Sequence, residues 1–117
     1  MELKRVVVTG LGALTPIGNT VPEFWENLIS GVSGAGPITH FDTSLFKTKF
    51  ACEVKNFNAT EYIDRKDARK MDHYTQYAVA VAKQAVTDSE LDLEKEDLNR
   101  IGVIFGAGIG EIGRAHV

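Results

Sequence analysis

Short apolar runs and one long apolar stripe organise the chain. Residues 5–10, where three valines are followed by Thr-Gly, and residues 101–106 have the β-branched, nearly uninterrupted pattern of strands buried on both faces. Residues 65–87 predict one long helix, with Asp64 as its N-cap. Its expected buried stripe has side chains three or four positions apart: Ala68, Met71, Tyr74, Ala78, Val81, Ala82 and Ala85. Strands of parallel character that flank a helix indicate the α/β class.

The segments between these elements give weaker signals. Thr20 and Glu23 have the spacing of a capping box, and the apolar face that follows predicts a helix ended by Gly31. Residues 31–48 are rich in glycine, serine and threonine and predict a loop, whereas residues 50–54 predict a short strand. The order of elements is that of one domain or of part of one.

Composition narrows the classes of protein to consider. The 117 residues are 44% hydrophobic and 25% charged with a net charge of −3, which is ordinary for a globular protein and gives no general attraction to nucleic acid. No apolar run approaches the ~20 residues that a membrane span needs, and the opening valines are too few for a signal-peptide core. A single cysteine excludes an internal disulfide and a multi-cysteine metal site. Together these features favour a cytoplasmic protein.

Two glycine-rich turns follow the predicted strands. After the first strand, Thr15 stands where a dinucleotide fingerprint needs its third glycine and Pro16 interrupts the helix that should receive the pyrophosphate, so we interpret residues 10–12 as a tight turn. Residues 108–113 match GxGxxG, but no helix and no downstream acidic residue follow, so we interpret the match as chance. We therefore expect no cofactor.

Cys52 would need a positioned base to act as a nucleophile. His40 and His73 are the available bases, and nothing in the spacing ties either of them to Cys52. The short predicted strand around Cys52 favours a small buried side chain, because unreactive cysteine behaves as a hydrophobe. We interpret His40 as a loop residue and His73 as a residue of the helix surface.

A cluster of cations is the most informative local feature. Lys66, Arg69 and Lys70 lie three and four positions apart, so they share one face of the predicted helix. In the first turns of that helix the dipole is already positive, which makes the cluster costly and favours an anionic partner. The charge pattern leaves the alternative open, a solvated face balanced by nearby acids: Asp64, Asp67 and Asp72.

The last seven residues, 111–117, raise a separate question. They are also what one reading frame of a widely used sequencing adapter encodes, and they follow a strand and a glycine turn after which an α/β fold should continue. We expect residues 1–110 to be a partial N-terminal domain and residues 111–117 to be a non-native tail. A genuine, divergent C-terminus is the alternative.

Several stretches resemble the β-ketoacyl-acyl-carrier-protein synthase II family, in order and with its spacing. Residues 6–18 resemble its opening V-V-V-T-G-L-G-x-[LV]-[ST]-P-[IV]-G signature. Residues 40–44 and 48–51 resemble its loop, and residues 65–72 its R-K-x-x-R-K-M-D element. Residues 106–110 resemble its G-[AS]-G-I-G turn.

This resemblance, which covers residues 3–110, implies a thiolase-like fold that has five α-β-α-β-α layers when intact and is usually a homodimer. It implies a decarboxylative Claisen condensation in fatty-acid elongation, which joins an acyl chain held on a cysteine to malonyl-acyl-carrier protein. That chemistry needs an activated thiolate, an oxyanion hole and two histidines. The family takes the cysteine from a T-A-C-[ST]-S motif and the histidines from far downstream. No position of this chain matches them, so no catalytic residue is assigned.

Some non-catalytic roles follow from the resemblance by position. Lys66, Arg69 and Lys70 match the basic helix that docks acyl carrier protein, which favours the docking interpretation. Ile109 matches the isoleucine that lines the acyl pocket, and Glu111 departs from the family's usual glycine. The expected parent is an elongating synthase without metal or cofactor. The alternatives are a polyketide-type ketosynthase or chain-length-factor domain, and an interaction fragment without activity.

Overall fold

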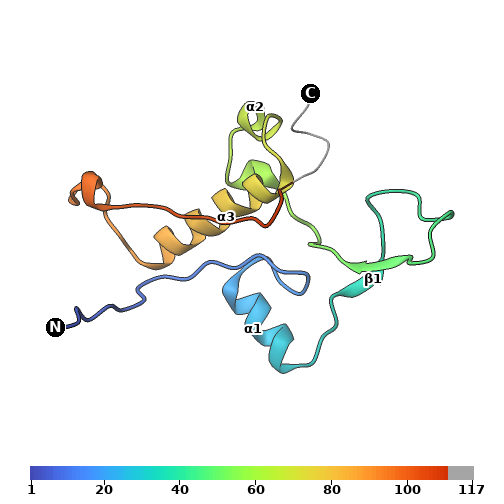
Figure 1. Ribbon diagram of the computed structural model, residues 1–117, viewed down its shortest axis with the longest axis horizontal. Coiled ribbons are helices and arrows are strands. Elements are labelled where there is room, and N and C mark those ends of the chain that lie inside the picture. The colour runs from blue at the N-terminus through green and yellow to red at the C-terminus, as the bar shows by residue number, and fades with distance from the viewer. Residues whose placement is uncertain (111–117) are drawn as a thin grey trace. The chain divides into compact units, whose positions relative to one another are not determined.

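The computed structural model describes residues 1–110 (Figure 1). They separate into two compact units, a hairpin unit of residues 13–58 and a helical unit of residues 1–12 with residues 59–110. The elements in chain order are α1 (Val21–Ile29), β1 (Ala35–Pro37), β2 (Phe50–Cys52), the 3-10 turn η1 (Ala59–Glu61), α2 (Arg65–Ala68), α3 (His73–Asp88) and the 3-10 turn η2 (Leu98–Arg100). No helix within residues 1–110 is long and apolar enough to cross a membrane.

Helix α1 of the hairpin unit begins and ends where the sequence predicts. The Thr20 hydroxyl accepts a hydrogen bond from the backbone N–H of Glu23, which is one of the two bonds of a capping box. The Glu23 carboxylate accepts one from the N–H of Asn19, the residue before the cap. Gly31 follows the last turn with a φ of 71°, the left-handed conformation that suits glycine after a helix.

A two-stranded antiparallel sheet completes the hairpin unit. β1 pairs with β2 with Gly36 opposite Ala51. β2 confirms the strand predicted within residues 50–54, but β1 lies inside residues 31–48, so the prediction of a loop there is wrong for β1. Its Ala-Gly-Pro sequence has no alternating pattern, and Pro37 lacks an N–H, so only the pairing with β2 defines it as a strand.

The long helix predicted at residues 65–87 is two helices in the structure. Asp64 caps α2 as predicted, because its Oδ1 accepts a hydrogen bond from the Lys66 N–H at 2.9 Å. Asp72 then stands in an extended conformation, with φ −67° and ψ 159°, as the N-cap of α3. The Asp72 side chain accepts no capping hydrogen bond from the first turn of α3, so the break is defined by the extended backbone at Asp72.

The core of the helical unit is small. The buried apolar residues among those described are Ile63, Ala68 and Ala80, and Ala80 has no exposed surface. The predicted stripe is confirmed at Ala68 and wrong at Tyr74, which is 43% exposed. The reason is that α3 packs inside this unit mainly through the face centred on Ala80, so Tyr74 on another face stays largely uncovered.

The two predicted buried strands are not strands in the described part of the chain. Residues 5–10 and 101–106 have no strand assignment, and Figure 1 draws both as plain tube. Val6 is 88% exposed and Ile104 is 97% exposed. A strand exists only when a neighbour exchanges hydrogen bonds with it, and residues 1–110 offer neither segment such a neighbour. Helices with a small sheet remain consistent with part of an α/β domain.

The glycines after the first apolar run have a packing role. Residues 10–12 form no turn, contrary to our prediction, and a Cβ on Gly10 would lie 2.2 Å from the carbonyl oxygen of Ala85 in α3. The tight turn comes later, where Thr15 and Gly18 exchange backbone hydrogen bonds of 2.8 and 3.2 Å. The absence of a side chain at Gly10 therefore allows close contact with the α3 backbone.

Two further predictions fall on the end of the chain. The suggested non-native tail, residues 111–117, lies outside the described residues. The chance GxGxxG match at residues 108–113 lies half outside them as well. Both stay predictions.

Candidate functional site

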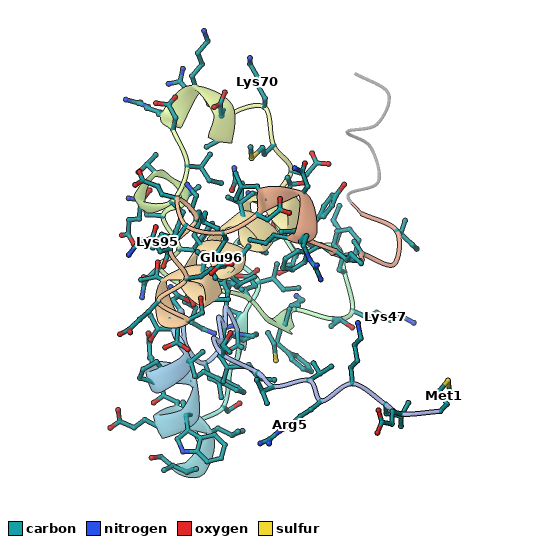
Figure 2. The ribbon with its side chains drawn as sticks, turned by 90° about the vertical axis from the view of Figure 1, so that its left-hand side faces the viewer. Met1, Arg5, Lys47, Lys70, Lys95 and Glu96 are labelled. Carbon is teal, nitrogen blue, oxygen red and sulfur yellow. The ribbon has the colours of Figure 1, made fainter. Side chains whose placement is uncertain are left out.

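The three cations singled out by the sequence, Lys66, Arg69 and Lys70, are called the basic segment here. All three are exposed, and Figure 2 shows Lys70 pointing away from the ribbon. Lys66 lies within α2, but Arg69 is the C-cap of α2 and Lys70 follows it. Our prediction that they occupy the first turns of a long helix is therefore wrong. A helix of four residues has little dipole of its own, so the end of α2 adds no strong preference for or against the cations.

The side chains of the basic segment form no close ion pairs with neighbouring acids in the described part of the chain. Within residues 1–110, none of its three side chains forms an ion pair with a carboxylate at 4 Å or less. Asp64 instead accepts the backbone N–H that starts α2. The alternative of a solvated face neutralised by its own aspartates is weakened, and an exposed positive surface remains.

Polar side chains of α3 hold the segment that carries these cations. Gln76 Nε2 donates to the carbonyl oxygen of Ala68 at 2.8 Å. Gln84 Nε2 donates to the Tyr62 hydroxyl at 3.1 Å, and Lys83 Nζ donates to the Tyr62 carbonyl oxygen. These contacts come from one side of α3, since positions 76, 83 and 84 recur on a helical period. Sequence reasoning missed all three, because a lone glutamine or lysine on a helix gives no motif.

Ile109 is largely exposed in the described part of the chain, at 81%. Residues shortly before Ile109 line an apolar hollow of about 210 Å³ together with residues of α3. The lining residues are Tyr74, Thr75, Ala78, Phe105, Gly106 and Ala107. Gly110 has a φ of 74°, and a Cβ on it would lie 3.2 Å from Cε1 of the Tyr74 ring. The segment that carries Ile109 thus runs beside Tyr74, but the role of Ile109 in an acyl pocket stays a prediction.

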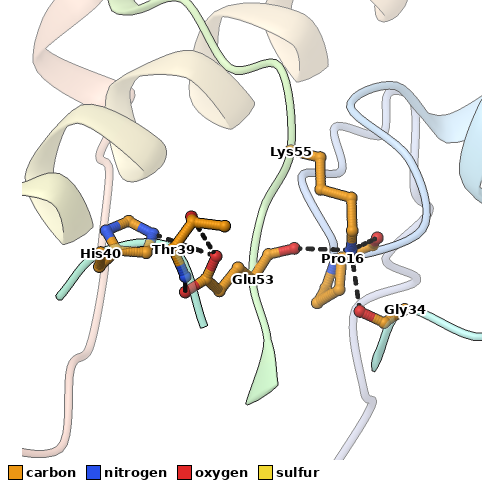
Figure 3. Close-up of polar contacts among 6 residues, drawn as sticks. All are labelled: Pro16, Gly34, Thr39, His40, Glu53 and Lys55. Carbon is orange, nitrogen blue, oxygen red and sulfur yellow. Dashed lines mark hydrogen bonds and ion pairs between the residues drawn. The ribbon is translucent and has the colours of Figure 1, made fainter. Parts of the chain in front are cut away.

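In the hairpin unit, Lys55 joins three backbone segments (Figure 3). Its Nζ donates to the carbonyl oxygens of Pro16 at 3.0 Å, Gly34 at 2.8 Å and Glu53 at 3.1 Å. An ammonium group has three N–H donors, so these contacts match its full capacity. Lys55 therefore has a structural role, because its ammonium group is bound by backbone carbonyl oxygens.

Glu53 has a second cluster of polar contacts, also visible in Figure 3. Its carboxylate accepts hydrogen bonds from the Thr39 N–H at 3.0 Å and the Thr39 hydroxyl at 2.7 Å, and His40 Nε2 lies 3.8 Å away. The Thr39 hydroxyl, followed by the Thr39 N–H, lowers the pKa of Glu53 below its ordinary value of 4.5. These contacts fasten the start of the β1–β2 loop to the residue after β2.

The remaining candidates divide into confirmed and corrected predictions. His40 lies in a loop and His73 lies exposed on α3, as predicted. Cys52 was predicted to be buried and is exposed. It shares a face of β2 with Phe50, which is 67% exposed, so nothing within the hairpin unit covers that face. Among residues 1–110, no group of three or more His, Cys, Asp or Glu side chains could hold a metal ion.

Residues 3–116 match the family described as "Beta-ketoacyl synthase, N-terminal domain". The chain belongs to this family. Its relatives include 3-oxoacyl-[acyl-carrier-protein] synthase 2 of Synechocystis sp., 49% identical over 110 residues, and the protein of the same name from Staphylococcus aureus, 51% identical over 107 residues. These matches cover 94% and 92% of this chain but 26% of each relative. The chain thus spans about a quarter of their length.

Solved structures resemble the same part of the fold. One is "The ishigamide ketosynthase/chain length factor", with a TM-score of 0.70 and 42% identity over 75% of this chain and 22% of the other. Another contains AntDE with AntF, a type II PKS acyl-carrier protein in complex with its ketosynthase. It has a TM-score of 0.64 and 30% identity over 84% of this chain and 24% of the other. The described residues therefore have the fold of part of a ketosynthase.

Proposed function

We propose that this chain is the N-terminal part of a 3-oxoacyl-[acyl-carrier-protein] synthase that elongates fatty acids. The observation that carries the proposal is the identity of 49% and 51% to two synthases of that name over more than nine tenths of the chain. The four stretches that resemble the family in register support it as well. The intact enzyme is proposed to be a homodimer with the five-layered thiolase-like fold.

The proposed reaction forms one carbon–carbon bond. An acyl group is held as a thioester on a cysteine of the enzyme, and malonyl-acyl-carrier protein loses CO₂ to give a carbanion. The carbanion attacks the acyl carbonyl, and the C–S bond to the cysteine breaks as the 3-oxoacyl product forms. An oxyanion hole and two histidines stabilise the charges that develop. This chain is proposed to supply scaffold and partner surface, and to be inactive alone because the T-A-C-[ST]-S motif is absent from it.

Acyl carrier protein is the proposed partner of the basic segment. Three exposed cations between residues 66 and 70, without ion pairs in the described part of the chain, suit an acidic protein surface. Because the three positive charges lie close together and are exposed, their attraction for an acidic protein should weaken as the salt concentration rises. One of the similar solved structures is itself a ketosynthase bound to a carrier protein, which supports this choice of partner.

A polyketide-type ketosynthase or its chain-length factor is the second candidate. The ishigamide ketosynthase/chain length factor favours it, with a TM-score of 0.70. Its identity of 42% is below the 49% and 51% of the fatty-acid synthases, so it ranks second. The gene sequence beyond the codon for Gly110 discriminates between them, because a chain-length factor does not keep the cysteine nucleophile. The same sequence tests whether residues 111–117 are native.

A graft tests the proposed activity. Residues 3–110 replace the matching segment of the Staphylococcus aureus synthase, and the graft is assayed for condensation of an acyl thioester with malonyl-acyl-carrier protein. We expect the graft to be active and the 117-residue chain alone to give no product. Turnover by the isolated chain would disprove the absence of catalytic groups. A folded graft without activity would count against the proposed function.

A further inference from the structure

The contact between Gln76 and Ala68 lies at the centre of the basic segment. Ala68 directly precedes Arg69 and comes two residues after Lys66. It is the last residue of α2 and is 7% exposed, whereas the cations on both sides of it are exposed. The 2.8 Å hydrogen bond from Gln76 therefore holds Ala68, the buried residue that lies between the exposed cations in the sequence.

The end of α2 needs such a contact. A helix of four residues leaves most of its carbonyl oxygens without partners inside the helix. The Ala68 carbonyl oxygen accepts the Met71 N–H at 3.2 Å and the Gln76 amide at 2.8 Å. The second bond comes from the first turns of α3, so it ties α2 to a helix of sixteen residues. Without it, α2 would lose a side-chain link to that helix.

The rest of the α3 face supports the same arrangement. Ala80, one turn after Gln76, has no exposed surface, so its small side chain lets the chain pack closely there. Another turn along, Lys83 and Gln84 hold Tyr62. The segment is thus fixed at two places, before α2 through Tyr62 and at its end through Gln76. The second place adjoins the cations.

We infer that Gln76 is a positioning residue for carrier-protein recognition: its amide fixes the end of α2 on α3 and thereby sets the spacing of Lys66, Arg69 and Lys70. The inference rests on the proposed docking role of the basic segment. A surface whose charges are already placed loses less conformational entropy on binding, so loosening α2 should weaken the complex without altering the net charge. Gln76 need not touch the partner itself.

The test compares Gln76→Met with Gln84→Met in the grafted synthase. Methionine keeps the length and the helix preference of glutamine but cannot donate a hydrogen bond. Gln84 is the matched control, since it is the same residue on the same helix and its amide holds Tyr62 instead. We expect Gln76→Met to raise KM for the acyl-carrier-protein substrate about fivefold, with kcat unchanged. KM for the same acyl group on pantetheine should stay constant, because that thioester carries no protein to dock.

The outcomes distinguish the positioning role of Gln76 from the docking role of the basic segment. Reversal of Lys66, Arg69 and Lys70 to glutamate is measured alongside. If the reversal leaves KM unchanged at low salt, the docking role itself is disproved. If the reversal raises KM while Gln76→Met and Gln84→Met behave alike, only the positioning role is wrong. Thermal melting checks both variants, and Gln76→Ala gives the same comparison if Gln76→Met does not fold.

Discussion

Gly12 lies so close to α3 that a Cβ on it would stand 2.1 Å from the carbonyl oxygen of Val81. The same Cβ would lie 3.1 Å from Cβ of Gln84. The obstacle is helix backbone, which cannot turn aside as a flexible side chain does. The contact explains why a glycine is needed at this position even though its φ is not in the left-handed region.

We predict that Gly12→Ala lowers the free energy of unfolding of the grafted synthase by ~1–3 kcal/mol, because the segment and α3 must separate to admit a methyl group. Urea denaturation measures the change. Gly36→Ala is the control, since a Cβ there meets nothing within 4 Å in the described residues and Gly36 lies outside the predicted buried strands. Equal stability of the two variants would contradict the close contact.

The sequence anticipated that glycines were needed after residues 5–9, but it could not indicate what they contact. A glycine pattern is the same whether the chain turns or approaches a helix. The ends of α1 were predictable, because Thr20, Glu23 and Gly31 act within a few residues of one another. Such local signals do not depend on the rest of the fold.

The break between α2 and α3 was not predictable in the same way. Residues 65–87 keep a helical pattern throughout, lysine and arginine are good helix formers, and no glycine or proline interrupts the segment. The break is marked by the extended backbone at Asp72 and is accompanied by the contact from Gln76 to Ala68, which the local sequence does not encode. The place of the cations at the end of a short helix was therefore not predictable, and their docking role stays a prediction.

The isolated chain is predicted to unfold without a sharp transition. Buried apolar residues among those described number three, whereas Val6 and Ile104 are among many exposed ones. A core this small cannot offset the loss of chain entropy on folding. Calorimetry of the 117-residue chain should give a broad trace, and a dye that binds exposed apolar surface should bind it strongly. A single steep melt would contradict this prediction, and the intact synthase is the control.

Lys55→Met should loosen the hairpin unit. The substitution keeps the aliphatic stem but removes the donor shared by the carbonyl oxygens of Pro16, Gly34 and Glu53. Because Lys55 is exposed, water replaces part of what is lost, so we expect ~1–2 kcal/mol. Hydrogen exchange of the Thr15 amide in the grafted synthase reports the change.

Lys47→Met is the matched control, since Lys47 is exposed and Figure 2 shows it pointing away from the ribbon. It should leave the exchange rate of the Thr15 amide as it was. If both variants exchange alike, Lys55 does not join the three segments in solution.

The Glu53 carboxylate should make the hairpin unit sensitive to acid. Because hydrogen bonds from Thr39 lower its pKa below 4.5, the charged form is favoured in the folded state. Its contribution to stability is then present above pH 4.5 and is lost as the pH falls through the lowered pKa. Thr39→Val removes the hydroxyl donor and should move the pKa of Glu53 up toward its ordinary value. A carbon-13 titration of the carboxyl group in the grafted synthase measures this.

Thr48→Val provides the comparison, because Thr48 is also exposed and lies in the same loop. It should leave the pKa of Glu53 as in the unsubstituted protein. The pH-dependent part of the stability difference between Thr39→Val and the unsubstituted protein should also disappear at low pH, where Glu53 is protonated in both proteins. A pKa of Glu53 that is the same in all three proteins would disprove the role of the Thr39 hydroxyl.

Ile109 carries the last prediction, which concerns the length of the acyl chain. It follows residues 105–107, which line an apolar hollow of about 210 Å³ together with Tyr74. The apolar lining suits an alkyl chain. If Ile109 lines the acyl pocket, Ile109→Phe in the grafted synthase places a larger side chain there and should exclude long chains before short ones. We expect kcat/KM for long-chain relative to short-chain thioesters to fall roughly tenfold or more. Leu45→Phe, in the β1–β2 loop at a position that is 95% exposed, tests whether any added ring has the same effect. If both variants change the ratio equally, Ile109 has no specific part in chain-length selection.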